Sequence, residues 1–206
     1  MKKILSLMLA LSMMMLTLCP AMAETAAATQ LLTSPDGSYS YEVPADYFAI
    51  NAETFMTLFN TPEMQQLMAQ MMGLQDASQL ELYFQIMQES NMMIVYTGDM
   101  MGNLNVQATP STMTIEQMVM FKELLDAAMV QQYVGLGVAE EDIHAMDIQE
   151  VGGRSWYGMQ LKMMGSDVVS MMTVENGIQY VFTFTAIDAA VYEQILASFN
   201  VVPAAQ

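Results

Sequence analysis

His144 is the residue with the clearest capacity for acid–base chemistry, and it is the only histidine in the chain. Asp142 and Asp147 flank it, and an imidazole near a carboxylate and a serine can act as a general base. The sequence contains neither a G-x-S-x-G nucleophile elbow nor a G-x-x-x-x-G-K phosphate loop. A lone histidine is more often a surface or structural residue. We therefore assign no catalytic residue and keep a hydrolase that uses His144 with nearby carboxylates as an alternative.

Metal and cofactor sites have little support among the residue types. Transition-metal sites usually need three or four imidazole, thiolate or carboxylate ligands in a fixed geometry, and the chain has one histidine and one cysteine. Methionine is abundant, with 26 residues. Thioethers bind Cu(I), but methionine also fills hydrophobic cores as a flexible apolar side chain. We expect core filling to dominate, and we predict no metal and no cofactor.

Two segments are the best candidates for a binding surface. A helical hairpin is predicted over residues 61–90, and flexible methionine-rich surfaces bind varied partners. The second segment is a strand start at which an arginine lies next to aromatic residues, a combination common at interfaces. A lipid or Cu(I) carrier that uses the Met-rich helices is a further alternative. The candidate residues are Met64, Met68, Met71, Met87, Arg154 and Trp156.

The first 23 residues have the three parts of a secretory signal. Lys2 and Lys3 precede an uncharged, largely apolar stretch over residues 4–18, and the tripeptide at residues 21–23 places alanine at positions −3 and −1. A membrane-spanning helix needs about 20 apolar residues, so this stretch is too short. We predict cleavage after Ala23 and an extracytoplasmic or secreted protein.

Cleavage at this position changes the chemistry of the remaining chain. It removes Cys19, the only cysteine, and with it thiol catalysis and disulfides. A lipoprotein in which Cys19 is lipidated is less favoured, because the large Leu18 precedes it. Removal of 23 of the 206 residues leaves 183, which carry 3 basic residues against 22 acidic ones, a net charge of −19. This charge repels nucleic-acid phosphates and anionic lipids, so we expect no nucleic-acid partner and no stable membrane insertion.

Hydrophobic periodicity predicts a single α+β domain over residues 34–203, preceded by a flexible tether at residues 24–33. The expected architecture is an antiparallel sheet of about six to seven strands flanked by helices, with the helical hairpin added. A capping box at Thr114 and Gln117 opens a long helix, and Asn176-Gly177 predicts a tight hairpin. The expected strands cover residues 39–43, 92–97, 104–109 and a four-strand meander over 143–185; the expected helices cover 61–73, 80–88, 114–134 and a closing helix from 188.

Four segments of the sequence resemble the PsbP-like superfamily. They are GSYSYEVPADY at residues 37–47, VGGRSWYGMQL at 151–161, NGIQYVFTFTA at 176–186 and YEQILASF at 192–199. The resemblance implies an α/β/α sandwich, a fold found in many bacterial exported proteins, and it implies no particular reaction. Two features depart from the family pattern: Tyr47 replaces the usual Trp, and the 61–90 hairpin is large. We expect a non-enzymatic exported domain that binds an unknown protein or small ligand at the cell envelope.

Overall fold

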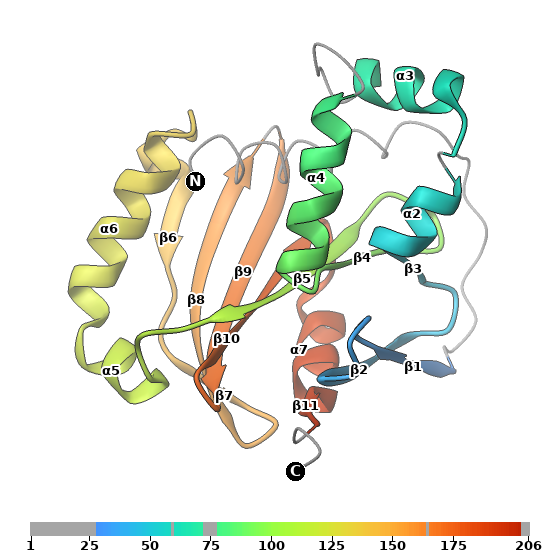
Figure 1. The fold of residues 1–206 in the computed structure, drawn as a ribbon. Helices are drawn as coiled ribbons and strands as arrows, with labels where there is room; N and C mark the ends of the chain where they lie inside the picture. The colour runs from blue at the N-terminus through green and yellow to red at the C-terminus, as the bar shows by residue number, and fades with distance from the viewer. Residues whose placement is uncertain (1–27, 59, 72–77, 164, 203–206) are drawn as a thin grey trace.

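The computed structural model describes residues 28–58, 60–71, 78–163 and 165–202 (Figure 1). The predicted signal peptide, its cleavage site and the start of the predicted tether lie outside these residues. Among the described residues, no helix has both the length and the apolar character needed to cross a membrane.

A large antiparallel sheet forms the centre of the fold (Figure 1). Its path joins chain segments that are distant in sequence, since β5 pairs with β10. The short β7 (Gln149–Val151) pairs with β8 beside this path. In spatial order the strands are β3 (Phe48–Asn51), β4 (Met93–Tyr96), β5 (Asn103–Pro110), β10 (Ile178–Thr185), β9 (Ser166–Glu175), β8 (Arg154–Met163) and β6 (Ile143–Ala145).

An aromatic core fills one face of this sheet. The even-numbered residues of β10 point to this face, as do Leu104 and Val106 of β5. Helix α7 (Ala189–Ser198) and a small sheet of β1 (Thr29–Thr33), β2 (Tyr39–Pro44) and β11 (Asn200–Val201) cover it. The centre of the core is a group of rings in mutual contact: Tyr39, Tyr41, Trp156, Tyr180, Phe182 and Phe199.

The opposite face is covered at its two ends by separate groups of helices (Figure 1). At one end α5 (Ile115–Met120) and α6 (Lys122–Val134) pack over β8 and β9. At the other end α2 (Ala52–Leu58) contacts β3, α4 (Ser78–Glu89) packs against α2, and α3 (Pro62–Met71) packs against α4. Phe55 of α2 meets Phe84 of α4 with ring centroids 4.9 Å apart. The central strands β5 and β10 lie between these two groups of helices.

The predicted α+β class and antiparallel sheet are confirmed, and two local predictions need correction. The flexible tether predicted over residues 24–33 is wrong for residues 29–33, which form β1 and pair with residues 40–44 of β2. The long helix predicted over 114–134 is broken at Phe121, whose φ of −103° and ψ of 22° depart from helical values. At this break the Phe121 side chain is 47% exposed.

Two neighbouring tyrosines of β2 provide a matched test of the aromatic core. The Tyr39 hydroxyl donates a hydrogen bond to the Asn91 carbonyl at 2.8 Å, whereas the buried Tyr41 hydroxyl has no hydrogen-bond partner among the described residues. Burial of a hydroxyl without a hydrogen-bond partner carries a desolvation penalty, and substitution by phenylalanine removes this penalty. We expect Tyr41→Phe to raise the free energy of unfolding by about 1 kcal/mol and Tyr39→Phe to lower it by about 1 kcal/mol. Urea denaturation of both variants checks this; equal losses would contradict the assignment.

Candidate functional site

A row of hydrogen-bonding side chains crosses the middle of the large sheet on its helix-covered face. Thr183 of β10 lies opposite Asn105 of β5 and, on its other side, opposite Ser170 of β9. Successive residues of a strand point to opposite faces, so Gln107 and Gln179 extend this polar surface along the same face. Interior sheet faces are normally apolar. A polar row across three central strands therefore suggests a binding surface.

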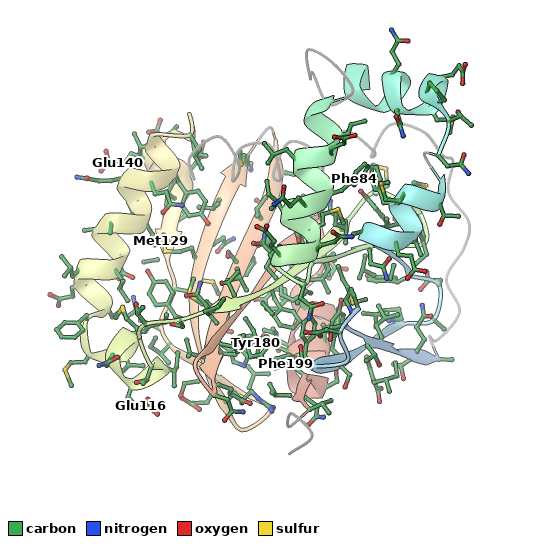
Figure 2. All side chains as sticks on the ribbon, in the orientation of Figure 1. Phe84, Glu116, Met129, Glu140, Tyr180 and Phe199 are labelled. Carbon is green, nitrogen blue, oxygen red and sulfur yellow. The ribbon has the colours of Figure 1, made fainter. Side chains whose placement is uncertain are left out.

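This surface forms the floor of a cavity of about 230 Å³, here termed the sheet pocket. Helix α6 provides the wall through Met129, Gln132 and Tyr133, and Figure 2 shows Met129 on the side of α6 that faces the sheet. Gln132 is exposed, so the wall extends to the protein surface. The apolar part of the floor is Leu161, Val168, Met172 and Val181.

Helix α6 is held against the sheet by a small polar cluster. The buried Tyr157 hydroxyl of β8 donates a hydrogen bond to Asp126 Oδ1 at 2.8 Å, and Lys122 Nζ lies 2.7 Å from Asp126 Oδ2. The Lys122 ammonium also lies 5.9 Å from the centre of the Tyr157 ring. Burial and the hydrogen bond to Asp126 raise the pKa of Tyr157, so the phenol stays protonated and remains a donor. The cluster fixes the wall of the sheet pocket relative to its floor.

Removal of this donor is expected to loosen α6. A hydrogen bond to a charged group stabilises a fold by about 1.5–3 kcal/mol. Because Asp126 is partly exposed, we expect Tyr157→Phe to lower the free energy of unfolding by an amount near the lower end of this range, about 1.5 kcal/mol. We expect amide hydrogen exchange to accelerate in α6 and to stay unchanged in α7, which packs on the opposite face of the sheet. Equal acceleration in both helices would show that the bond stabilises the fold generally and does not anchor α6 in particular.

The chemistry of the sheet pocket is neutral. Among the described residues that line it, none is acidic or basic. Burial raises the pKa of Tyr133, and a hydrogen bond with the Ser170 side chain partly opposes this rise, so the phenol is uncharged at neutral pH. Asn105 is 6% exposed, and its side-chain oxygen has no hydrogen-bond partner among the described residues. The pocket thus offers amide and hydroxyl groups next to apolar side chains, without a fixed charge.

The structure describes the side chains of two of the four methionines predicted to form a binding surface. Met87 is 1% exposed and belongs to the core, so its assignment to a binding surface is wrong. It lies on the face of α4 that also buries Leu80 and Phe84. Met64 is 39% exposed on α3. The side chains of Met68 and Met71 lie outside the described residues, so their place on a binding surface stays a prediction.

Arg154 and Trp156 serve the interior of the fold. Trp156 is fully buried and donates its indole N–H to the Val151 carbonyl at 3.1 Å, so its assignment to a binding surface is wrong. Arg154 forms an ion pair with Glu175 and donates to the Phe199 carbonyl at 2.7 Å. Its guanidinium carbon lies 5.1 Å from the centre of the Phe199 ring. Arg154 therefore joins β8, β9 and the end of α7.

His144 lies exposed on the edge strand β6, opposite Gln160 of β8. No described residue forms a hydrogen bond or ion pair with its imidazole. No group of three or more histidine, cysteine or acidic residues suited to a metal is found among the described residues. The hydrolase alternative therefore gains no support from the surroundings of His144.

A second hollow, of about 300 Å³, lies beside Pro35, Asn51 and Met87. Its acidic group Asp36 is already engaged in a turn: Ser34 Oγ and the Ser38 backbone N–H both donate to Asp36 Oδ1 at 2.9 Å. Burial, the largest single influence, raises the pKa of Asp36, but hydrogen bonds from Ser38, Ser34 and Asn91 together leave it below its usual value. This carboxylate stabilises the turn before β2, and the sheet pocket is the better candidate site.

Comparisons with known proteins identify the fold. No protein-family model matches the sequence, and no curated protein matches it. Among solved structures, cyanobacterial PsbP from Synechocystis is similar over 90% of this chain and 99% of that chain, with a TM-score of 0.50 and 9% identity. The chain therefore has the PsbP-like fold, and the resemblance seen in the sequence is confirmed at the level of fold.

Two further structures align less well. The Ran-binding protein Mog1p of Saccharomyces cerevisiae has a TM-score of 0.47 at 9% identity, over 85% of this chain and 96% of that chain. A protein of Bacteroides thetaiotaomicron has a TM-score of 0.43 at 14% identity, over 84% of this chain and 48% of that chain. At these values the comparisons say nothing about a ligand or partner.

The residues of the sheet pocket are not among those that the sequence singles out. The alternation of Gln179 and Thr183 with large apolar residues is typical of an ordinary strand with one solvent-facing side. A second signal is present in NLNVQAT at residues 103–109, where Asn, Gln and Thr alternate with Leu, Val and Ala. Neither pattern reveals that the two strands are neighbours, and their pairing is what makes the polar row.

Proposed function

We propose that this protein is an exported, non-enzymatic binding domain that holds a small molecule in the sheet pocket. The observation that carries the proposal is the polar row Asn105–Thr183–Ser170 in the centre of the sheet, next to a cavity with an anchored helical wall. Concave sites with a few convergent polar groups among apolar side chains are typical ligand sites. The described lining includes no histidine, cysteine or carboxylate, which favours binding over acid–base catalysis.

Placement at the cell envelope rests on the N-terminal sequence. The basic start, the uncharged stretch and the alanines at residues 21 and 23 support export followed by cleavage. Intact-mass analysis of the protein recovered outside the cytoplasm tests this part. We expect the mature chain to begin at Glu24; a full-length chain retained in the cytoplasm would contradict export.

The binding proposal is tested by capture of small molecules with a blocked pocket as control. The mature protein is incubated with a small-molecule extract of the source cells and their medium, washed, and its bound compounds are released and identified by mass spectrometry. Met129→Trp fills the pocket from its wall. Val134→Trp adds the same side chain to the same helix at a position that is 43% exposed and outside the pocket lining.

We expect a compound to be retained by the native chain and by Val134→Trp, and lost from Met129→Trp. A ligand that binds the folded state at 100 times its Kd stabilises it by about 2.7 kcal/mol, so the captured compound should also raise the melting temperature. Retention of the same compounds by Met129→Trp, or capture of none by the native chain, would refute the proposal.

A further inference from the structure

We infer that the ligand of the sheet pocket is uncharged and donates a hydrogen bond to the side-chain oxygen of Asn105. This inference rests on the proposed function and concerns the chemical class of the ligand. Asn105 lies on β5 between Ile94 of β4 and Thr183 of β10, so its side chain emerges from the interior of the sheet. It is 6% exposed and lines the pocket.

The Asn105 oxygen sets the requirement for a donor. It is buried and has no hydrogen-bond partner among the described residues, and a buried acceptor left unpaired is costly. A ligand N–H or O–H that reaches this oxygen removes that cost, whereas a ligand without a donor leaves it. Specificity of this kind is strong, because the penalty falls on every analogue that lacks the matching group.

The absence of charge in the described lining sets the second requirement. An anion would enter a partly buried site without a cation beside it, in a chain whose net charge is −17. A cation would enter without a carboxylate partner. In both cases the charge loses its hydration and gains no counter-charge, which is strongly unfavourable. A neutral group forms hydrogen bonds with the amides and hydroxyls without this penalty.

The apolar side chains and the volume of the pocket complete the description. Val181 and Met172 on the floor and Met129 on the wall provide apolar contacts beside the polar row. At about 230 Å³ the pocket is smaller than the 300–1,000 Å³ of drug-sized sites. The ligand class is therefore a small neutral amide or hydroxyl compound with an apolar part.

Three probes of nearly equal shape test the class. Benzamide is neutral with N–H donors, benzoate is its anionic counterpart, and benzamidinium is its cationic counterpart. Each is titrated into the mature protein at physiological salt, which screens the long-range attraction of a cation to an acidic protein. Binding at the pocket is read from NMR shifts of the Val181 and Met129 methyl groups. We expect benzamide to bind about tenfold or more tightly than either ion, because benzoate leaves the Asn105 acceptor unpaired and benzamidinium leaves its own charge unpaired.

Variants at Asn105 assign the effect to this residue. Asn105→Leu removes the acceptor and keeps a side chain of similar size, so it should weaken the binding of benzamide about tenfold. Asn105→Asp places a carboxylate in the pocket and should shift the preference to benzamidinium. Asn200→Asp makes the same change at an exposed position of β11 and should leave all three affinities unchanged. Asn105→Leu alone decides the matter if the buried aspartate prevents folding.

The outcomes separate this inference from the proposed function. Preferential binding of benzamide that is lost in Asn105→Leu supports the inference. Equal or tighter binding of benzoate or benzamidinium to the native chain overturns the ligand class but leaves the pocket as a binding site. If none of the probes shifts Val181 and Met129, the inferred class is also overturned, while the proposed function is judged independently by the capture experiment.

Discussion

Phe199→Ala is expected to lower the free energy of unfolding by about 4 kcal/mol, in the range for a fully buried phenylalanine. Phe199 follows α7 and is 2% exposed. Its ring centroid lies 5.0 Å from that of Tyr180 and 5.1 Å from that of Phe182, at the steep angles that favour edge-to-face contact. Figure 2 shows Tyr180 and Phe199 side by side below β5. Truncation leaves a cavity between α7, the small sheet and the large sheet.

The Arg154 guanidinium lies against the Phe199 ring, which increases the loss of stability expected for Phe199→Ala. The Arg154 guanidinium is held by its contact with the Phe199 ring and by a hydrogen bond to the Phe199 carbonyl. Loss of the ring therefore also loosens the ion pair between Arg154 and Glu175. Phe121→Ala is the control, because it makes the same change at a side chain that is 47% exposed. We expect a change within about 0.5 kcal/mol for this control. Chemical denaturation measures the free energy of unfolding of both variants. Similar losses in Phe199→Ala and Phe121→Ala would show that Phe199 is not central to the core.

Gly152→Ala is expected to lower the free energy of unfolding by about 3 kcal/mol through two effects. Gly152 has a φ of +62°, a conformation that costs an L-residue about 1–2 kcal/mol. A Cβ at this position would lie 2.8 Å from the Ala197 carbonyl oxygen and 2.9 Å from the Ala197 Cα. Both atoms belong to the backbone of α7, which has to move, and such overpacking typically costs about 1–3 kcal/mol.

The adjacent glycine separates the two effects. Gly153 has a φ of +75°, and no described atom lies within 4 Å of the position that a Cβ would occupy there. Gly153→Ala should therefore show the conformational cost alone, about 1 kcal/mol. Thermal and urea unfolding of the two variants measure the difference. Equal destabilisation would mean that the contact with α7 relaxes freely and that only the backbone conformation matters.

Local chemistry made much of the fold predictable from the sequence. The capping box forms as expected, with the Gln117 N–H donating to Thr114 Oγ1 at 3.3 Å and the Thr114 N–H donating to Gln117 Oε1 at 2.9 Å. Asn176 and Gly177 both have positive φ and connect β9 to β10. These features depend on residues a few positions apart, so their energetics can be judged from the sequence alone.

Non-local contacts decided the elements that were missed. Residues 29–33 show no periodic pattern and look like a flexible tether, and they become a strand because β2 offers them a free edge. The pattern of the 114–134 helix is continuous, but the chain bends at Phe121 so that α5 and α6 can each pack against the sheet. Burial of Trp156 and Met87 likewise depends on which layers cover β8 and α4.

The sequence by itself determined the acidic composition, the strand and helix periodicities and the turn chemistry, because each is a property of one residue or of close neighbours. The tertiary structure alone decided the candidate site. Asn105 and Thr183 are far apart in the chain, and the register that pairs them is set by the apolar face that both strands bury in the aromatic core. That register brings two ordinary polar strand faces together beside α6 and creates the sheet pocket.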